Sequence, residues 1–409
     1  MSMTTAPVID LLDPEAFDGG QPHEVFRWLR EHDPVHRHDE PGGPGFWAVT
    51  RYEDVKAIGR DPATFSSAHG ILIPDGTEVG DGGAGSPRMM ITMDPPDHGR
   101  YRRLVVPAFI PKAVKSMQPR IDVLAGSIID GVVEGGECDL VEQVAGLMPS
   151  YVVADLLGIP HTDGVELYRL TEVIHSAPES QPAGAAAGAA MQMLQYAHGV
   201  WEDKRAHPAD DLATTLAHAE VDGSHLSEID FGLFFLLLVD AGGDTTRNLV
   251  ATGTLALLEH LVQLTWLQAD LDGRLAPAIE ELLRWVSPVV YMRRTALRDS
   301  SLHGRDIRAG DKVVMYYGSA NRDDAVFDEP DRLDLSRSPN EHVAFGGGGP
   351  HFCVGAHIGR AEIEAMFRQI CTRLDDLQLA GDPEWLPSTF ISGVKHLPVR
   401  FRAGPRQSR

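Results

Sequence analysis

A single cysteine near the C-terminus stands where a reactive sulfur is expected. The segment FGGGGPHFCVG, residues 345–355, sets four glycines and a proline just before Cys353. Apolar residues recur at three- and four-residue intervals after the cysteine, so the sulfur is predicted to lie at a helix N-terminus. Backbone N–H groups and the helix dipole favour a thiolate there, and a thiolate is either a nucleophile or a metal ligand.

The residues alone leave three interpretations of Cys353 open. It can be a structural cysteine buried behind a flexible loop. It can be a zinc ligand, because His351 and His357 lie close by in the sequence, although no second cysteine stands at ligand spacing. It can also be a catalytic nucleophile, although the sequence identifies no base for it.

A second unusual segment interrupts an apolar helix. LLLVDAGGDTTRN, residues 236–248, carries two glycines that each cost about 1 kcal/mol relative to alanine inside a helix. Asp244, Thr245 and Thr246 follow them and add polar groups. A helix used only for packing does not need this pattern, and the alternative is an ordinary kink or break.

Two further pairs have helical spacing. Glu281 and Arg284 stand three residues apart, the spacing of an ion pair, which on a surface contributes well under ~1 kcal/mol. His98 and Arg102 stand four apart on a helix predicted to start after two prolines. Without further evidence, the second pair is a solvent-exposed basic face.

The elements that must position these residues are mostly helical. Apolar periodicity predicts long helices within residues 102–133, 229–263, 276–286 and 358–374. Strand patterns are short and fewer, at residues 45–50, 312–317 and 397–401. The predicted class is therefore mainly α with a small β portion.

Length and composition suggest one large domain. No segment of the 409 residues resembles an interdomain linker, so we expect a single domain over 1–409 with a short flexible N-terminus, about residues 1–20. Two biased stretches, Asp75 to Pro87 and Gln181 to Ala190, are interpreted as mobile loops.

Charge and cysteine usage exclude several classes. The 36 basic and 59 acidic residues give a formal charge of −23, which opposes nucleic-acid binding. The N-terminus lacks a secretory pattern and no apolar run reaches membrane-spanning length, so we expect a soluble, cytoplasmic protein without a membrane anchor. Cys138, Cys353 and Cys371 are too few and too widely spaced for a disulfide framework.

The cysteine segment resembles the proximal loop of cytochrome P450 heme-thiolate monooxygenases. The matching positions are Phe345, Gly346, the basic His351, Cys353 and Gly355. One departure is an extra glycine, which sets Phe345 eight rather than seven residues before the cysteine, a variant of a subset of bacterial members. The resemblance implies a cytochrome P450 fold with heme b, iron protoporphyrin IX, between a long distal helix and this loop. Cys353 is then the axial iron ligand, screened by Phe345.

The same resemblance assigns the other segments. His98, Arg102, Arg294 and His351 become donors to the heme propionates, with Arg293 adjacent and open to exchange with Arg294. The Glu281–Arg284 pair closes a structural network with Arg337. These implied residues support the heme and its loop and are not catalysts.

The distal helix is assigned by its alanine-glycine-x-acid-threonine motif. Ala241, Gly242, Asp244 and Thr245 match it, and the glycines are expected to open a local bulge with room for dioxygen. Thr245 is expected to hydrogen-bond the oxygen and Asp244 to link it to solvent protons. This acid and alcohol favour a monooxygenase over a peroxide-driven peroxygenase or a non-enzymatic heme sensor.

The implied reaction inserts one oxygen atom of O₂ into a C–H bond of a hydrophobic substrate, with a ferredoxin and a ferredoxin reductase as electron donors. The segments SPVVYMRRTA, SANRDDAVFDEP and FISGVKHLPV resemble actinobacterial hydroxylases of methyl-branched lipids and sterol side chains. A branched lipid, terpenoid or steroid-like substrate is therefore expected, with a macrocycle as the rival. Apolar residues assigned to the pocket by analogy, any of which can instead be core, are Leu238, Ala241, Val289, Val290, Phe390 and Ile391.

Overall fold

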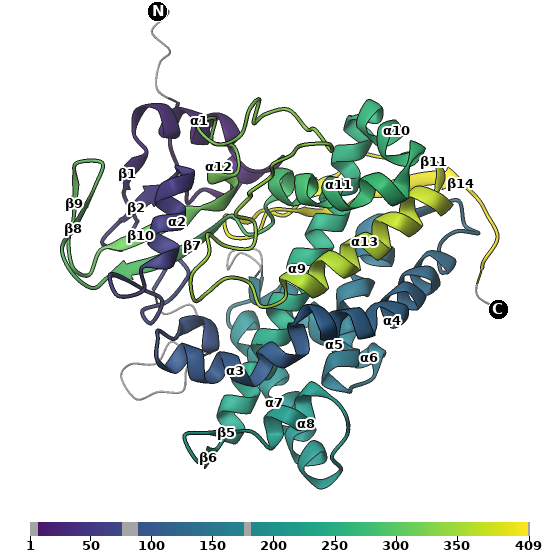
Figure 1. The fold of residues 1–409 in the computed structure, drawn as a ribbon, viewed down its shortest axis with the longest axis horizontal. Helices are drawn as coiled ribbons and strands as arrows, with labels where there is room; N and C mark the ends of the chain where they lie inside the picture. The colour runs from purple at the N-terminus through teal and green to yellow at the C-terminus, as the bar shows by residue number, and fades with distance from the viewer. Residues whose placement is uncertain (1–6, 76–88, 176–180, 408–409) are drawn as a thin grey trace, which may run out of the picture.

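The structure of the chain is a computed structural model that describes residues 7–75, 89–175 and 181–407. Helices fill most of the body, and a smaller part built around a sheet lies beside the N-terminus (Figure 1). The helices are α1 (His23–His32), α2 (Tyr52–Arg60), α3 (Asp97–Phe109), α4 (Pro111–Asp130), α5 (Leu147–Leu157), α6 (His161–His175), α7 (Ala185–Ala206), α8 (Leu212–Ala217), α9 (Glu228–Glu259), α10 (Leu261–Ala269), α11 (Leu271–Val286), α12 (Tyr317–Ala320) and α13 (Ala356–Arg373).

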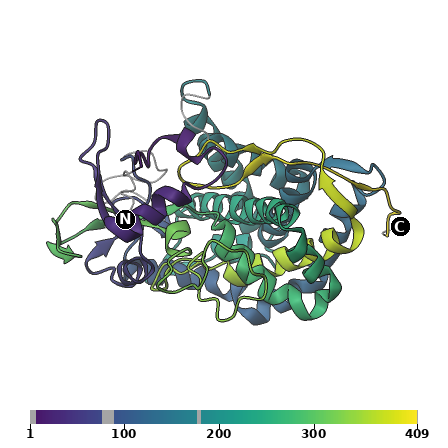
Figure 2. The same cartoon turned by 90° about the horizontal axis from the view of Figure 1, so that it is seen from above.

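The longest helix, α9, runs through the middle of the molecule with other helices around it (Figure 2). Ser227 caps its N-terminus by accepting a hydrogen bond from the backbone N–H of Asp230 at 3.1 Å. Most of its residues are buried, because α5, α7 and α13 pack against different sides of it. A helix that is apolar on nearly all sides belongs in the core of a large domain.

The main sheet has the order β1-β2-β10-β7-β3. β10 pairs parallel with β2 and antiparallel with β7. A second sheet has the order β11-β14-β4, and β5-β6, β8-β9 and β12-β13 form separate pairs. The short helical turns are η1 (Pro14–Phe17), η2 (Met90–Thr92) and η3 (Val141–Ala145). The strands are β1 (Val35–His38), β2 (Phe46–Val49), β3 (Phe65–Ser66), β4 (Glu137–Asp139), β5 (Glu220–Val221), β6 (Ser224–His225), β7 (Tyr291–Ala296), β8 (Ser300–Leu302), β9 (Arg305–Ile307), β10 (Lys312–Tyr316), β11 (Asp375–Leu379), β12 (Glu384–Trp385), β13 (Val394–His396) and β14 (Pro398–Arg402).

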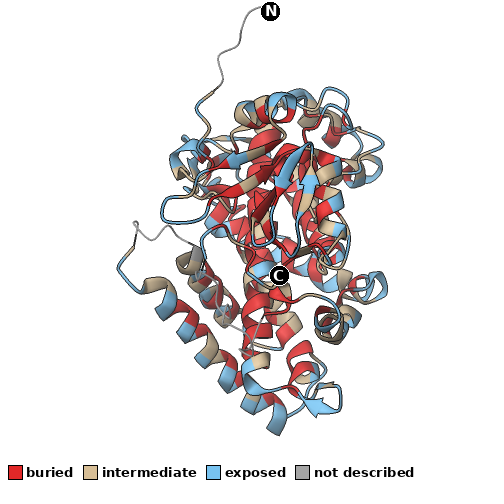
Figure 3. Cartoon of the chain, turned by 90° about the vertical axis from the view of Figure 1, so that its left-hand side faces the viewer, coloured by how far each residue is buried: buried red, intermediate tan, exposed pale blue. Residues whose placement is uncertain are grey.

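Burial follows this two-part arrangement. One large apolar core lies among the helices, and two smaller apolar clusters involve strands of the main sheet. Figure 3 shows buried residues along the central elements and exposed residues on the outer sides of the peripheral helices. No helix among the described residues is long and apolar enough to cross a lipid bilayer.

The predicted class, mainly α with a small β portion, is confirmed. The predicted helices and strands are all present, with two divisions: residues 102–133 form α3 and α4, and residues 229–263 run from α9 across His260 into α10. Ile110 adopts an extended conformation between α3 and α4, and Pro111 starts α4, since proline fits the first helical position.

Three segments were expected to be flexible or to form loops: the N-terminus, the alanine-rich stretch and the acidic glycine-rich stretch. The N-terminus was expected to be flexible over about residues 1–20, but Leu11 and Phe17 are buried in the core beside the sheet. The alanine-rich stretch was expected to be a loop, but α7 starts at Ala185, in keeping with the high helix propensity of alanine. The acidic glycine-rich stretch after Asp75 lies outside the described residues, as do residues 1–6.

Candidate active site

The glycine loop before Cys353 is wedged against α2. Gly346, Gly348 and Gly349 have φ values of +91°, +94° and +79°, a region that other residues rarely adopt. A Cβ atom at Gly349 would collide with the carbonyl oxygen of Gly59 at the end of α2. The glycines therefore permit a tight path of the chain and its close approach to the helix.

The end of this loop fixes Cys353 at the start of α13. Its backbone N–H donates to the Phe345 carbonyl at 3.0 Å, and Gly355 is the N-cap of the helix. Burial raises the pKa of the Cys353 thiol, while the Gly355 N–H and the charges of Arg102 and Arg360 oppose that rise. Burial thus outweighs the helix N-terminus, contrary to the expectation of a thiolate from position alone. A bound metal cation reverses this balance, because a coordinating thiol is deprotonated.

One stripe of α9 is accessible although the helix is central. Leu238, Ala241, Gly242 and Thr245 retain accessible surface among buried neighbours, at intervals of three or four residues. Cys353 likewise retains accessible surface, although the surrounding protein is dense enough to raise the pKa of its thiol. α9 and α13 meet where the Thr246 hydroxyl bonds Glu362, which brings the stripe and the cysteine loop to one part of the molecule.

The adjacent glycines Gly242 and Gly243 of α9 serve packing. The expected bulge is absent, because α9 is continuous from Glu228 to Glu259. A Cβ atom at Gly242 would lie 2.7 Å from Val153 of α5, and one at Gly243 would lie 2.7 Å from the Tyr168 ring of α6. The glycines let two neighbouring helices approach α9 closely.

The acid and the alcohol of α9 face different surroundings. Asp244 is buried and accepts a hydrogen bond from the Tyr168 hydroxyl at 2.9 Å. Thr245 lies on the accessible stripe, and its hydroxyl is 3.4 Å from the Ala241 carbonyl oxygen. Arg247, one turn later, pairs with Glu172 of α6 at 3.0 Å. The carboxylate is therefore held on the α6 side of the helix.

Four basic side chains gather beside the cysteine loop, from α3, β7 and the loop itself. The rings of His98 and His351 lie 4.1 Å apart between centroids. Arg102 donates to the Phe352 carbonyl at 2.6 Å, and Arg294 donates to the Arg293 carbonyl at 2.7 Å.

Among the described residues, this basic cluster forms no ion pair with an acid. Burial, followed by the charge of Arg102, lowers the pKa of His98 to about 4; burial, followed by the charge of Arg294, lowers that of His351 to about 2. Within the described residues, neither arginine forms an ion pair with a carboxylate, and the neighbouring Asp94 is bound by Ser66 and Ser67. Partly or fully buried guanidinium groups without acids suit an anionic ligand, so this donor set fits the two propionates of a heme.

The adjacent Arg293 has a different environment. It pairs with Asp75 at 2.6 Å and donates to the carbonyl groups of residues 69 and 72. Successive residues of a strand point to opposite sides. Arg294, and not Arg293, is therefore the arginine on the side of His98 and His351.

The structural network has the geometry that the resemblance implies. Arg284 donates to both oxygens of Glu281 at 2.8 Å, and both side chains are fully buried. Arg337 approaches the same carboxylate at 3.1 Å, and Asn340 donates to it at the same distance. Arg284 also donates to the carbonyl groups of residues 321 and 330, which ties α11 to the segment that leads to the cysteine loop.

The predicted substrate positions separate into two sets. Leu238 and Ala241 lie on the accessible stripe. Val289 forms an isolated β-bridge with Ile391, and Val290 donates to the Phe390 carbonyl at 2.9 Å. Val290 is fully buried in the apolar cluster beside the sheet, and Ile391 is also buried, whereas Val289 and Phe390 retain some accessible surface.

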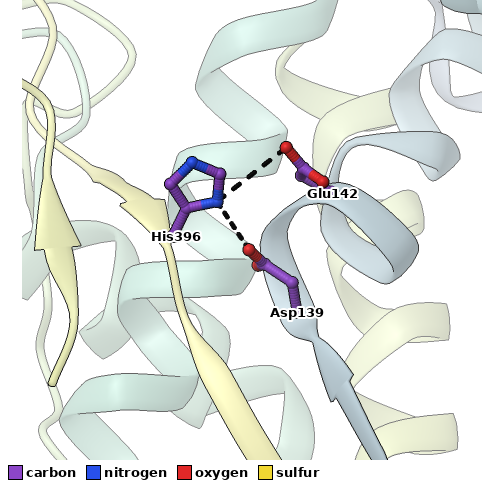
Figure 4. Close-up of side chains that lie close together, drawn as sticks. All are labelled: Asp139, Glu142 and His396. Atoms are coloured by element: carbon purple, nitrogen blue, oxygen red, sulfur yellow. Dashed lines mark hydrogen bonds and ion pairs between the residues drawn. The ribbon is translucent and has the colours of Figure 1, made fainter. Parts of the chain in front are cut away.

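A zinc site at Cys353 has no support from the described residues. The group of three or more possible ligands found among them is Asp139, Glu142 and His396, far from the loop in sequence (Figure 4). There the His396 ring bonds Asp139 at 2.6 Å, and Asp139 also accepts backbone N–H groups of residues 141 and 397. These bonds join β13 to the start of η3.

Sequence reasoning missed several residues of this region. Tyr168 contacts Asp244, Arg360 contacts Phe345, Glu362 contacts Thr246, and Glu280 pairs with Arg360. Arg360 and Glu362 lie one to two helical turns beyond the recognised motif, and their position on α13 is the only signal that could have identified them. Nothing in the sequence around Tyr168 indicates its contact with Asp244.

Comparisons with known proteins agree with this geometry. Residues 275–383 match the family model Cytochrome P450. A Methyl-branched lipid omega-hydroxylase of Mycobacterium tuberculosis is 38% identical over 97% of this chain and 95% of that protein. A Steroid C26-monooxygenase of Rhodococcus jostii is 34% identical over 96% of this chain and 84% of that protein.

A solved structure extends the agreement to the fold. Mycobacterium marinum cytochrome P450 CYP268A2 in complex with pseudoionone has a TM-score of 0.90 and 37% identity, covering 98% of this chain and all of that one. The expected fold is thereby confirmed. By sequence and by structure, the chain belongs to the cytochrome P450 family and is an oxidoreductase of its heme-dependent monooxygenase and hydroxylase type.

Proposed function

We propose that this protein is a heme-thiolate monooxygenase that uses heme b and O₂ to hydroxylate a hydrophobic substrate. One observation carries the proposal: Cys353, the basic cluster, which has no ion pair with an acid among the described residues, and the accessible stripe of α9 belong to one region inside the fold. The sulfur supplies an iron ligand, and the stripe borders the space where substrate binds. For the two propionates, Arg102 and Arg294 supply cations, and the neutral rings of His98 and His351 supply N–H donors.

Bound heme supplies the activation of dioxygen, and the residues of α9 supply the rest. Leu238 and Ala241 exclude water from their side of the pocket because they are apolar. The Thr245 hydroxyl is the accessible polar group of the stripe and can donate a proton there. Asp244, the next acid on the helix, supplies protons to Thr245 after its carboxylate leaves Tyr168. This acid and alcohol favour the monooxygenase over the peroxide-driven alternative, which needs no proton relay.

The substrate class is an elongated hydrophobic molecule oxidised near a chain end. Relatives named for methyl-branched lipid and steroid hydroxylation support this class, as do the apolar positions Val289, Phe390 and Ile391. Burial of each CH₂ group contributes about 0.8 kcal/mol, so affinity grows with chain length. We further propose a cytoplasmic enzyme that receives electrons from a ferredoxin and its reductase.

The spectrum of the reduced carbon monoxide complex tests the iron ligand. The purified protein is expected to show the long-wavelength band of thiolate-ligated heme, because a thiolate donates electron density strongly. Cys353→His is expected to lose this band while retaining heme. Cys371→Ser is the matched control, since Cys371 lies on α13 away from the loop. A band that persists in Cys353→His contradicts the assignment.

A ligand panel tests the substrate class. Branched fatty acids, terpenoids, steroids and macrolides are titrated into the heme-loaded protein while the Soret band is followed for a high-spin shift. The proposal expects shifts from the branched or steroid-like compounds. Tight binding of a macrolide, with no shift from any branched lipid, contradicts the substrate class and leaves the reaction type intact.

A further inference from the structure

An ion pair between Arg360 and Glu280 lies beside the cysteine loop and has no role in the function proposed so far. Arg360 is on α13, seven residues after Cys353, and its guanidinium carbon lies 4.5 Å from the centroid of the Phe345 ring. The carbonyl of Phe345 accepts the backbone N–H of Cys353 at 3.0 Å. Arg360 thus places a positive charge against the ring of the residue that accepts the backbone N–H of Cys353.

The charge of Arg360 acts on Cys353. It is one of two arginine charges that favour the ionised form of the thiol and so lower its pKa against the effect of burial; the other is Arg102. Arg102 forms no ion pair with a carboxylate among the described residues, and its hydrogen bond goes to a backbone carbonyl. The two cations therefore differ, because only Arg360 has an acid in direct contact.

That acid is Glu280 of α11, which forms a bidentate ion pair with Arg360. The Nε and Nη2 groups of Arg360 donate to its two carboxylate oxygens at 2.6 and 2.8 Å. His342 approaches the same carboxylate at 3.0 Å. Although burial opposes it, hydrogen bonding from Arg360 and His342 lowers the pKa of Glu280 to about 2, so the carboxylate stays ionised at neutral pH. Arg360 therefore acts on the sulfur as one half of a charge pair, whereas Arg102 acts on it as a single cation.

We propose that the Glu280–Arg360 pair sets the reduction potential of the iron bound by Cys353, with Arg360 raising it and Glu280 lowering it. This inference rests on the proposed function. Reduction of a ferric heme thiolate adds one electron and hence one negative charge next to the sulfur. A neighbouring cation stabilises the reduced form and a neighbouring anion destabilises it. Both side chains are 31% exposed, so water screens the effect but does not abolish it.

Single variants of the two residues are predicted to move the potential in opposite directions. Arg360→Gln removes the cation and is expected to make the potential more negative. Glu280→Gln leaves Arg360 uncompensated and is expected to make it less negative. The double variant is expected to lie between the two, near the parent protein, and Arg360→Lys is expected to stay close to the parent because it keeps the charge.

The potential is measured by dye-mediated equilibrium titration of the heme-loaded protein. The C–O stretching frequency of the reduced carbon monoxide complex is a second readout, because a sulfur that donates more strongly weakens the C–O bond. Arg360→Gln is expected to lower this frequency and Glu280→Gln to raise it. Arg368→Gln is the matched control: Arg368 lies on the same helix and pairs with Asp272 at 2.6 Å.

The possible outcomes separate this inference from the proposed function. Opposite shifts from the two single variants, with no shift from the control, support it. Shifts of the same sign, or none, overturn it, since loosening of the structure alone gives no opposite pair. If the parent protein lacks the thiolate band altogether, the proposed function fails first and this inference fails with it.

Discussion

A buried carboxylic acid between α9 and α13 makes stability depend on pH in a defined way. Glu362 is 3% exposed, and burial raises its pKa from 4.5 to about 8 despite a hydrogen bond with Thr246. Between these two values the folded protein keeps a proton that the unfolded chain has released. Folding therefore loses stability as pH rises through this window, and the loss is complete above about pH 8.

The size of this loss follows from the two pKa values. Since one pKa unit corresponds to 1.36 kcal/mol, the difference between 4.5 and about 8 corresponds to a loss of about 5 kcal/mol. Relaxation of the structure around the ionised carboxylate makes the measured loss smaller than this. Glu362→Gln keeps the size of the side chain and its acceptor for Thr246 but cannot ionise. The variant should therefore become the more stable of the two proteins at about pH 9, while it gains nothing at about pH 5.

Urea unfolding of the heme-loaded proteins, followed by circular dichroism across this pH range, measures the difference. Glu364→Gln is the matched control, because Glu364 lies two residues further along α13 with a 45% exposed side chain. A second measurement is the infrared band of a protonated carboxylic acid, which should be present in the parent protein and missing from Glu362→Gln. Parallel stability curves for the parent and Glu362→Gln would refute the argument.

Three further predictions concern the site and its support. Thr245→Ala should keep most electron consumption but divert it to peroxide, because the accessible hydroxyl of the stripe is lost; an unchanged product yield per electron contradicts the relay. Glu281→Gln should cost about 3–5 kcal/mol, since it leaves the buried Arg284 uncompensated and weakens the contact with Arg337, and a denaturant midpoint equal to that of the parent contradicts this. Val289→Ala should widen the approach beside Ile391 and move oxidation inward along a branched chain, as product analysis by mass spectrometry can show.

The predictable parts of the site are those whose residues lie close together in the sequence. The glycine loop, Cys353 and the start of α13 follow each other directly, so their order and the helix start were predictable from the sequence, while the role of Cys353 came from the resemblance. The pairing of Glu281 with Arg284 is likewise local to one helix. Arg337 could be added only because the resemblance supplied a partner more than fifty residues away.

The parts that were not predictable depend on how separate helices pack. Gly242 and Gly243 were expected to open α9, but their real partners are Val153 and Tyr168, which no local pattern connects to them. The same holds for Asp244, whose side chain faces α6 because of one hydroxyl on that helix. Apolar periodicity identifies the apolar face of a helix, but it does not identify the helix that packs against that face.

The contacts of Asp75 have a consequence for how this enzyme can be altered. Asp75 pairs with Arg293 of β7 and with Lys312 of β10 at 2.6 and 2.9 Å, and Met89 and Met90 are buried where the described chain resumes. The segment that ends at Asp75 is thus tied to two neighbouring strands of the main sheet by one carboxylate. Engineered changes that spare Asp75, Arg293 and Lys312 should therefore leave this attachment to the sheet intact.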